Sequence, residues 1–249
     1  MGVFLALYAP IVTLVLFSFN ADTSMSRWGG LSLRWYRDAF ANEVVQEAAL
    51  RSLLVATVAA LASTLLAVPA ALGTVRAGRF RGRTAIFALI NQPLMVPEIV
   101  TAVALLLVFG IVRQATGWQG IGYLLLAHTA FCIPFAYLPI RARLEGLDAR
   151  LEVAARDLYA TPWTAFRRIT LPLLLPGIAA GAMLAFVVSL DDVVITELVK
   201  SAGQETLPTY LLGEMRRNLT PEVNAISTAL LALTLVLLTL FFVLTAKRG

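Results

Sequence analysis

Long apolar segments with few or no charges are the feature that most constrains this chain. They lie at about residues 3–20, 50–75, 84–112, 118–140, 171–192 and 223–246. Each is near or above the ~20 residues that a helix needs to cross the hydrocarbon core of a bilayer. Of the 249 residues, 59% are hydrophobic and 14% are charged, which is far outside the composition of soluble proteins. The sequence therefore predicts an all-α integral membrane protein with six transmembrane helices in one domain, residues 1–249.

Arginines are unevenly distributed between the two sets of connecting loops. They concentrate in the 76–83 loop, in the 141–172 loop and beside Lys247 in the C-terminal tail. The positive-inside bias therefore predicts that both termini are cytoplasmic. The first span lacks the basic start and cleavage site of a secretory signal, so we expect it to remain in the membrane. This topology accounts for the net charge of +5, which gives no indication of a nucleic-acid partner.

Two polar segments are predicted on the external side. Residues 20–47 mix Trp28, Trp35 and other aromatic residues with charges, which is typical of a short amphipathic helix at the membrane surface. This helix can serve as an interfacial anchor or as a contact for a periplasmic partner. Residues 199–222 are expected to form a second external loop with one short helix.

The 141–172 loop is longer than a connection between neighbouring helices requires. Apolar residues recur at spacings of three and four from Leu151 to Leu158, which predicts an amphipathic helix. Thr161 suits an N-cap and Pro162 the first position of a second helix. Such a projection can lie on the anionic leaflet or fill a groove in a soluble partner.

Three carboxylates lie inside or at the edge of apolar spans. Asp191 and Asp192 follow an uncharged run and are expected at the external end of the fifth span, whereas Glu98 lies deep in the third. Pro93 and Pro97 interrupt the hydrogen-bond ladder beside Glu98, so we expect a kink there. A carboxylate inside a membrane is costly unless it meets water, a cation or a partner. These residues are therefore candidates for a functional role.

The remaining reactive side chains do not indicate a metal site or an enzyme. His128 and Cys132, the only histidine and cysteine, lie one turn apart in the fourth span and are too few for a metal centre. We expect them at a packed helix interface or along a pathway. A phosphate-binding loop needs a lysine after glycine, and neither Lys200 nor Lys247 follows one. The sequence therefore predicts no catalytic residue, no metal and no ATPase on this chain.

The segment "EVAARDLYATPWTAFRRITLP" resembles the EAA loop of permeases from type I ABC importers. The residues that match this pattern in register are Ala154, Ala155, Ile169, Leu171 and Pro172. Val153 occupies the position of the family glutamate, with Glu152 one residue earlier, and Tyr159 occupies that of the family glycine. A non-glycine residue in the left-handed turn there costs about 1 kcal/mol, so Tyr159 leaves the turn geometry open.

The resemblance implies a MetI-like permease fold in a bacterial inner membrane, with residues 141–172 as the loop that couples to the ATPases; we call it the coupling loop. It also implies a B-type permease partner, two ATPase subunits that bind ATP and Mg²⁺, and a periplasmic solute-binding protein. The stretches "HTAFCIPFAYLPIRARLEGLD", "VVSLDDVVITELV" and "PEVNAISTALLAL" resemble the C-type permeases of spermidine/putrescine importers.

A polyamine carries several ammonium groups, and carboxylates at separate heights would pass it along. The hypothesis is that Glu98, Asp191 and Asp192 form this pathway, with Tyr123 or Tyr137 as further lining residues. A permease of the same architecture for an opine or an amino-acid derivative is the main alternative. A proton-coupled carrier is another, but no second half matches "NQPLMVPEIV" as inverted repeats would require.

Overall fold

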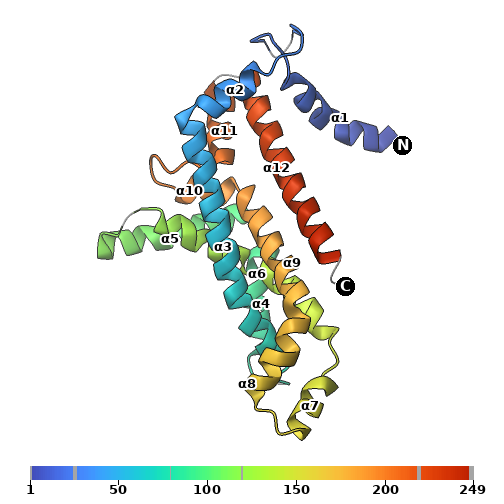
Figure 1. Ribbon diagram of the computed structural model, residues 1–249. Coiled ribbons are helices and arrows are strands. Elements are labelled where there is room, and N and C mark those ends of the chain that lie inside the picture. The colour runs from blue at the N-terminus through green and yellow to red at the C-terminus, as the bar shows by residue number, and fades with distance from the viewer. Residues whose placement is uncertain (1, 25–26, 79, 119, 218–219, 247–249) are drawn as a thin grey trace. The chain divides into compact units, whose positions relative to one another are not determined.

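The structure is a computed structural model that describes residues 2–24, 27–78, 80–118, 120–217 and 220–246. Within them the regular secondary structure is helical, apart from an isolated bridge between Asn20 and Leu31. The prediction of an all-α protein is confirmed. The helices in chain order (Figure 1) are α1 (Gly2–Phe17), α2 (Arg34–Ala41), α3 (Glu43–Val75), α4 (Arg83–Met95), α5 (Glu98–Thr116), α6 (Gly122–Glu145), α7 (Arg150–Asp157), α8 (Pro162–Ala165), the π-helix Phe166–Thr170, α9 (Leu171–Leu190), α10 (Val194–Val199), α11 (Leu207–Arg217) and α12 (Pro221–Ala246).

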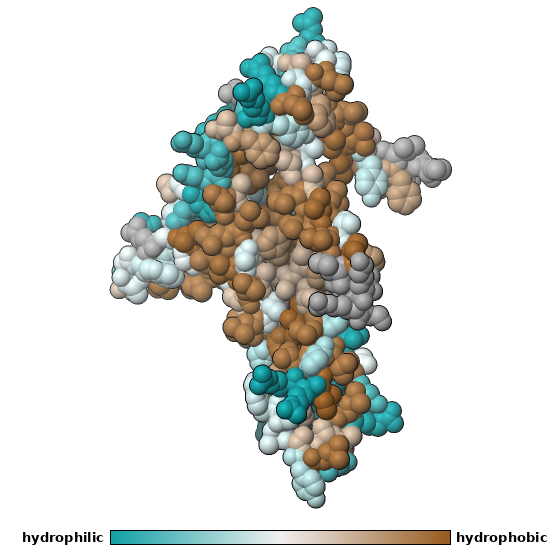
Figure 2. Space-filling model, in the orientation of Figure 1, coloured by the Kyte–Doolittle hydropathy of each residue, from teal (hydrophilic) through white to brown (hydrophobic). Residues whose placement is uncertain are grey.

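Among the described residues, 5 helices are long and apolar enough to cross a membrane. They are Glu43–Val75, Glu98–Thr116, Gly122–Glu145, Pro162–Leu190 and Pro221–Val243. The remaining predicted span, about residues 3–20, corresponds to α1, which has 16 residues and a shorter apolar part, Ala6–Phe17. Large hydrophobic side chains are exposed along these helices, and Figure 2 shows them over much of the face that it draws. A surface of this kind is suited to lipid or to other apolar chains.

The predicted third span, residues 84–112, is divided into α4 and α5 at Pro97. Val96 has an extended backbone, with φ −108° and ψ 140°, and α5 begins at Glu98. Proline disfavours the helical conformation of the residue before it, which explains why the break falls at Val96. Pro93 remains inside α4. The expected interruption beside Glu98 is therefore present, and it is produced by Pro97.

The chain divides into two compact units, residues 1–53 with 202–249 and residues 54–201. In the first unit, α2 is the short helix predicted within residues 20–47, and it packs against α12. Trp35 on α2 is buried, and its indole N–H donates to the backbone oxygen of Asn20 (2.8 Å). The N–H of Leu207 donates to the hydroxyl of Ser52 (2.7 Å), which fixes the start of α11 to α3.

In the second unit, α6 and α9 pack closely along one another. Gly177, Gly181 and Ala185 follow one another at intervals of four residues on α9, and all three are buried. A side chain at Gly181 would overlap the carbonyl oxygen of Ala136 on α6. Small residues at such spacing let two membrane helices approach until their backbones touch. This close pair carries the candidate site at one end of α9 and the coupling loop at the other.

Candidate functional site

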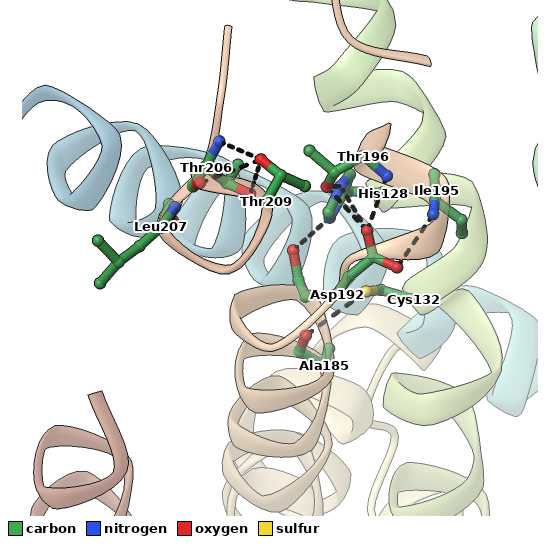
Figure 3. Close-up of polar contacts among 11 residues, drawn as sticks. His128, Cys132, Ala185, Asp192, Ile195, Thr196, Thr206, Leu207 and Thr209 are labelled. Carbon is green, nitrogen blue, oxygen red and sulfur yellow. Dashed lines mark hydrogen bonds and ion pairs between the residues drawn. The ribbon is translucent and has the colours of Figure 1, made fainter. Parts of the chain in front are cut away.

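Asp192 lies in the short junction between α9 and α10, and its carboxylate is hydrogen-bonded by neighbouring residues of the same chain. Its carboxylate accepts hydrogen bonds from the N–H of Ile195 (3.3 Å), the N–H of Thr196 (2.9 Å) and the hydroxyl of Thr196 (2.8 Å). Its side chain is 1% exposed. Figure 3 shows these bonds converging on the carboxylate. Asp192 therefore holds the first turn of α10 in place after α9 ends.

His128 on α6 joins both sides of this junction. Its Nδ1 lies 2.7 Å from the hydroxyl of Ser189 on α9, and its Nε2 lies 2.9 Å from the hydroxyl of Thr196 on α10. Nε2 is also 3.4 Å from the carboxylate of Asp192, and the imidazole is fully buried (Figure 3). Sequence reasoning expected His128 at a packed interface or along a pathway, and the structure places it in a packed interface. Its partners were missed because they lie far away along the chain.

Glu98 lies beside Asp192, although the two are distant in sequence. It is the first residue of α5, which packs against α10, and its carboxyl group interacts with that of Asp192. Glu98 is partly exposed and Asp191 is exposed. Sequence reasoning expected the carboxylates at separate heights. The helix break at Pro97 instead brings Glu98 to the α9–α10 junction.

Two neighbouring carboxyl groups, one at the start of α5 and one in the α9–α10 junction, constrain what the site can bind. Like charges at close range repel, and each charge alone is costly in a medium of low dielectric constant. A cation between the groups, or a proton shared by them, removes both penalties. Because Glu98 and Asp191 are the accessible members and Asp192 is enclosed, a cation from solution would meet Glu98 and Asp191 first.

The two tyrosines predicted as pathway residues are buried on α6. The hydroxyl of Tyr123 donates to the backbone oxygen of Trp118 (2.8 Å), and that of Tyr137 lies 2.8 Å from the hydroxyl of Thr74. Both rings are in contact with other aromatic rings, including Phe109 and Phe87. Bonds of this kind favour a packing role. Contact of either tyrosine with solute stays a prediction.

The predicted start of the coupling loop, residues 141–145, is the last turn of α6, and the first helix that lies wholly within the loop is α7. The turn at Tyr159, whose geometry the sequence leaves open, follows the C-terminus of α7. The N–H of Ala160 donates to the oxygen of Ala155 (3.0 Å), and the N–H of Tyr159 donates to that of Arg156 (2.9 Å). This is the Schellman pattern that ends many helices. Tyr159 adopts the left-handed conformation there, with φ 60°. The loop therefore keeps a turn that suits glycine and tolerates the strain of a tyrosine.

The second helix of the coupling loop starts as predicted. The hydroxyl of Thr161 accepts from the N–H of Thr164 (3.2 Å), and Pro162 is the first helical residue. The π-helix Phe166–Thr170 follows, and it contains Ile169. Leu171 and Pro172 begin α9. A π-helix is rare and is often found at functional sites. This one lies directly before α9, where the coupling loop joins a membrane span.

The coupling loop presents an apolar surface, which we call the loop face. Tyr159 is 97% and Leu158 81% exposed. Ala155 is buried, while the adjacent Ala154 is exposed. Glu152 turns inward toward Arg76 and Thr170. The exposed apolar residues of the loop face are Leu151, Val153, Ala154, Leu158, Tyr159 and Trp163.

A bundle of apolar helices, a break that positions a carboxylate and an EAA-like loop together describe a transport permease. The model of the family "Binding-protein-dependent transport system inner membrane component" matches residues 63–247. The chain belongs to this family, which confirms the resemblance. It is a multi-pass inner-membrane permease.

Named relatives match along most of the chain. It is 40% identical over 231 residues to the putrescine transport system permease protein PotI of Escherichia coli (strain K12), covering 92% of this chain and 82% of the relative. It is 39% identical over 247 residues to the spermidine/putrescine transport system permease protein PotC of Haemophilus influenzae, covering 99% and 95%. PotC of Escherichia coli (strain K12) is 36% identical over 236 residues, covering 95% and 88%. These relatives are named as permease proteins of transport systems.

Solved structures share the fold. A chain of the MetNI methionine ABC transporter superposes with a TM-score of 0.67 at 17% identity, covering 83% of this chain and 96% of that chain. A chain of a bacterial ABC transporter involved in the import of the acidic polysaccharide alginate gives a TM-score of 0.72 at 16% identity, covering 97% and 90%. The predicted MetI-like fold of ABC importer permeases is confirmed.

Proposed function

We propose that this chain is the C-type permease of an ATP-driven polyamine importer. The observation that carries the proposal is the pairing of Glu98 with Asp192 at the α9–α10 junction, with Asp191 exposed beside it. This acidic site suits an ammonium group. The relatives that match over most of the chain are named for putrescine and spermidine, which are alkyl chains that carry ammonium groups at neutral pH.

Within this function the three carboxylates have different roles. Glu98 and Asp191 are accessible and would replace part of the hydration shell of a passing ammonium group. Asp192 is enclosed by hydrogen bonds and would act from behind Glu98 through its charge. Tyr123 and Tyr137 would reach the solute only if α6 changes its packing during transport.

The proposed assembly contains a B-type permease, two ATPase subunits and a periplasmic solute-binding protein. The loop face is the proposed contact with an ATPase, since exposed apolar side chains on a short amphipathic helix suit a groove in a soluble partner. The exposed residues that would enter that groove are Val153, Ala154 and Tyr159. Ala155 is buried within this chain and would support the loop face from behind. ATP and Mg²⁺ would be bound by the ATPase subunits, with both termini of this chain in the cytoplasm.

The test is ATP hydrolysis and uptake by the complex reconstituted in liposomes with its partner permease, ATPases and binding protein. We expect stimulation by putrescine or spermidine and none by opines or neutral amino acids. Stimulation by one of those other solutes alone would retain the importer and reject the polyamine assignment.

The acidic site is tested in the same liposomes with Glu98→Gln and Asp191→Asn. At subsaturating polyamine we expect each variant to take up solute about tenfold more slowly, because each loses roughly 1.4 kcal/mol of attraction for the cation. Glu47→Gln is the matched control, because Glu47 is an exposed carboxylate on α3, outside the acidic site and the coupling loop. Unchanged uptake in Glu98→Gln and Asp191→Asn complexes that assemble normally would contradict this assignment.

A further inference from the structure

In the second unit, a single carboxylate oxygen connects α7, the end of α3 and the π-helix. Oε1 of Glu152 on α7 accepts from Nε of Arg76 (3.2 Å), the residue that follows α3. The same oxygen accepts from the hydroxyl of Thr170 (3.0 Å), the last residue of the π-helix before α9. Arg76 also donates through Nη2 to the backbone oxygen of Leu147 (3.1 Å). We call these bonds the Arg76–Glu152 clasp.

The clasp is partly shielded from water, in contrast to the Arg150–Asp148 ion pair of the coupling loop. The side chains of Arg76 and Glu152 are 21% and 20% exposed. Arg150 and Asp148 also form an ion pair (2.8 Å), but their side chains are 90% and 46% exposed. Exposed pairs contribute little, whereas charge-assisted bonds in a shielded site with several donors are strong and directional. The clasp can therefore resist a force that the exposed pair cannot.

The position of Glu152 indicates that it does not act on the ATPase directly. The apolar residues that face outward on α7 are Leu151, Val153 and Ala154, whereas Glu152 is turned toward Arg76 and Thr170. An ATPase that pulls on the loop face must move the end of α3 and the start of α9 with it, or break the clasp. The π-helix lies next to this connection, and its wider turn is a natural place for helix geometry to change.

We propose that Glu152 is a positioning residue, and that the Arg76–Glu152 clasp transmits displacement of α7 to α3 and α9. The role in transport rests on the proposed function, in which the coupling loop contacts an ATPase. Without the clasp, α7 would still bind the ATPase through the loop face. Its motion would then be taken up within the loop and would not reach the membrane helices.

The coupling part is tested with Glu152→Gln in the reconstituted complex, with Arg150→Gln as the matched control. Because the loop face is intact in Glu152→Gln, we expect the ATPases to stay bound and ATP hydrolysis to stay within about twofold of the unmodified complex, while uptake falls about tenfold. The number of ATP molecules hydrolysed per solute imported would rise accordingly. A parallel fall of hydrolysis and uptake, or no change in either, would overturn the proposal.

A charge exchange separates the clasp from a direct contact of Glu152 with the ATPase. Arg76→Glu and Glu152→Arg should each uncouple transport, and the double variant should recover part of the coupling because the attraction is restored. If Glu152 instead contacted an ATPase cation, the double variant would be at least as defective as Glu152→Arg. That outcome would reject the clasp.

The clasp itself is tested without any solute. Amide hydrogen exchange of residues 150–157 in the assembled complex should be about tenfold faster in Glu152→Gln and unchanged in Arg150→Gln, because only the first variant removes the charge that strengthens the bonds holding α7. Equal exchange in both variants would refute the clasp. If the clasp is present but no polyamine stimulates the unmodified complex, the solute assignment fails while the mechanical connection stands.

Discussion

At the scale of single residues, neighbours in sequence have opposite environments. Asp191 is exposed, whereas the carboxylate of Asp192 receives three donors and lies close to His128. Ala154 and Ala155 differ in the same way on α7. Ala154 and Ala155 differ because consecutive helical residues point about 100° apart, whereas Asp191 and Asp192 differ because α9 ends at Leu190 and the chain turns into the α9–α10 junction. Roles should therefore be assigned to each residue of such a pair separately.

Alanine substitutions of the two aspartates should differ in their effect on stability. Asp192→Ala leaves the N–H groups of Ile195 and Thr196 buried without acceptors, so we expect a loss of about 3 kcal/mol in unfolding free energy. Asp191→Ala should change it by no more than about 0.5 kcal/mol. The two variants are compared by the midpoint of thermal unfolding of the purified complex in detergent, which Asp192→Ala should lower and Asp191→Ala should leave nearly unchanged. Equal destabilisation by the two variants would contradict the environments described for them.

At the scale of helices, the contact between α6 and α9 depends on a missing side chain. Gly181 lies against the backbone of Ala136, and the sequence of small residues on α9 continues through Gly177 and Ala185. In a membrane, such contacts replace the hydrophobic driving force that packs soluble helices. The pair must keep its register, because it connects the acidic site to the coupling loop.

Gly181→Val should disrupt this pair. The added methyl groups would meet backbone that cannot move aside, so we expect a destabilisation of about 3 kcal/mol. We also expect less assembled complex. Gly110→Val on α5 is the matched control, since a Cβ at Gly110 meets nothing within 4 Å. Yield and elution volume of the detergent-solubilised complex measure the effect. A stable, assembled Gly181→Val complex would contradict the close approach.

At the scale of the whole molecule, the predicted orientation of the chain in the membrane determines which partners each loop could reach. The arginine distribution predicts that the coupling loop faces the cytoplasm and that α2 faces the outside. The proposed contact of the loop face with an ATPase depends on this orientation. An ATPase can reach only the first of these sides, and a periplasmic binding protein only the second.

The orientation is tested by cysteine labelling in a Cys132→Ala background. Arg37→Cys on α2 and Arg156→Cys on α7 are exposed positions. In intact cells with a permeable outer membrane, an impermeant maleimide should label Arg37→Cys and leave Arg156→Cys unmodified, and inside-out vesicles should give the reverse. Labelling of Arg156→Cys from outside would invert the topology and remove the proposed ATPase contact.

The sequence alone determined the properties that depend on local chemistry. Apolar length predicted the membrane helices, Pro97 the break before Glu98, and Thr161 with Pro162 the start of α8, because each follows from a few neighbouring residues. Only the tertiary structure decided that Glu98 meets Asp192, that His128 binds the α9–α10 junction, and that Glu152 is clasped by Arg76. These contacts join residues far apart along the chain, and helix packing, which no local pattern encodes, brings them together.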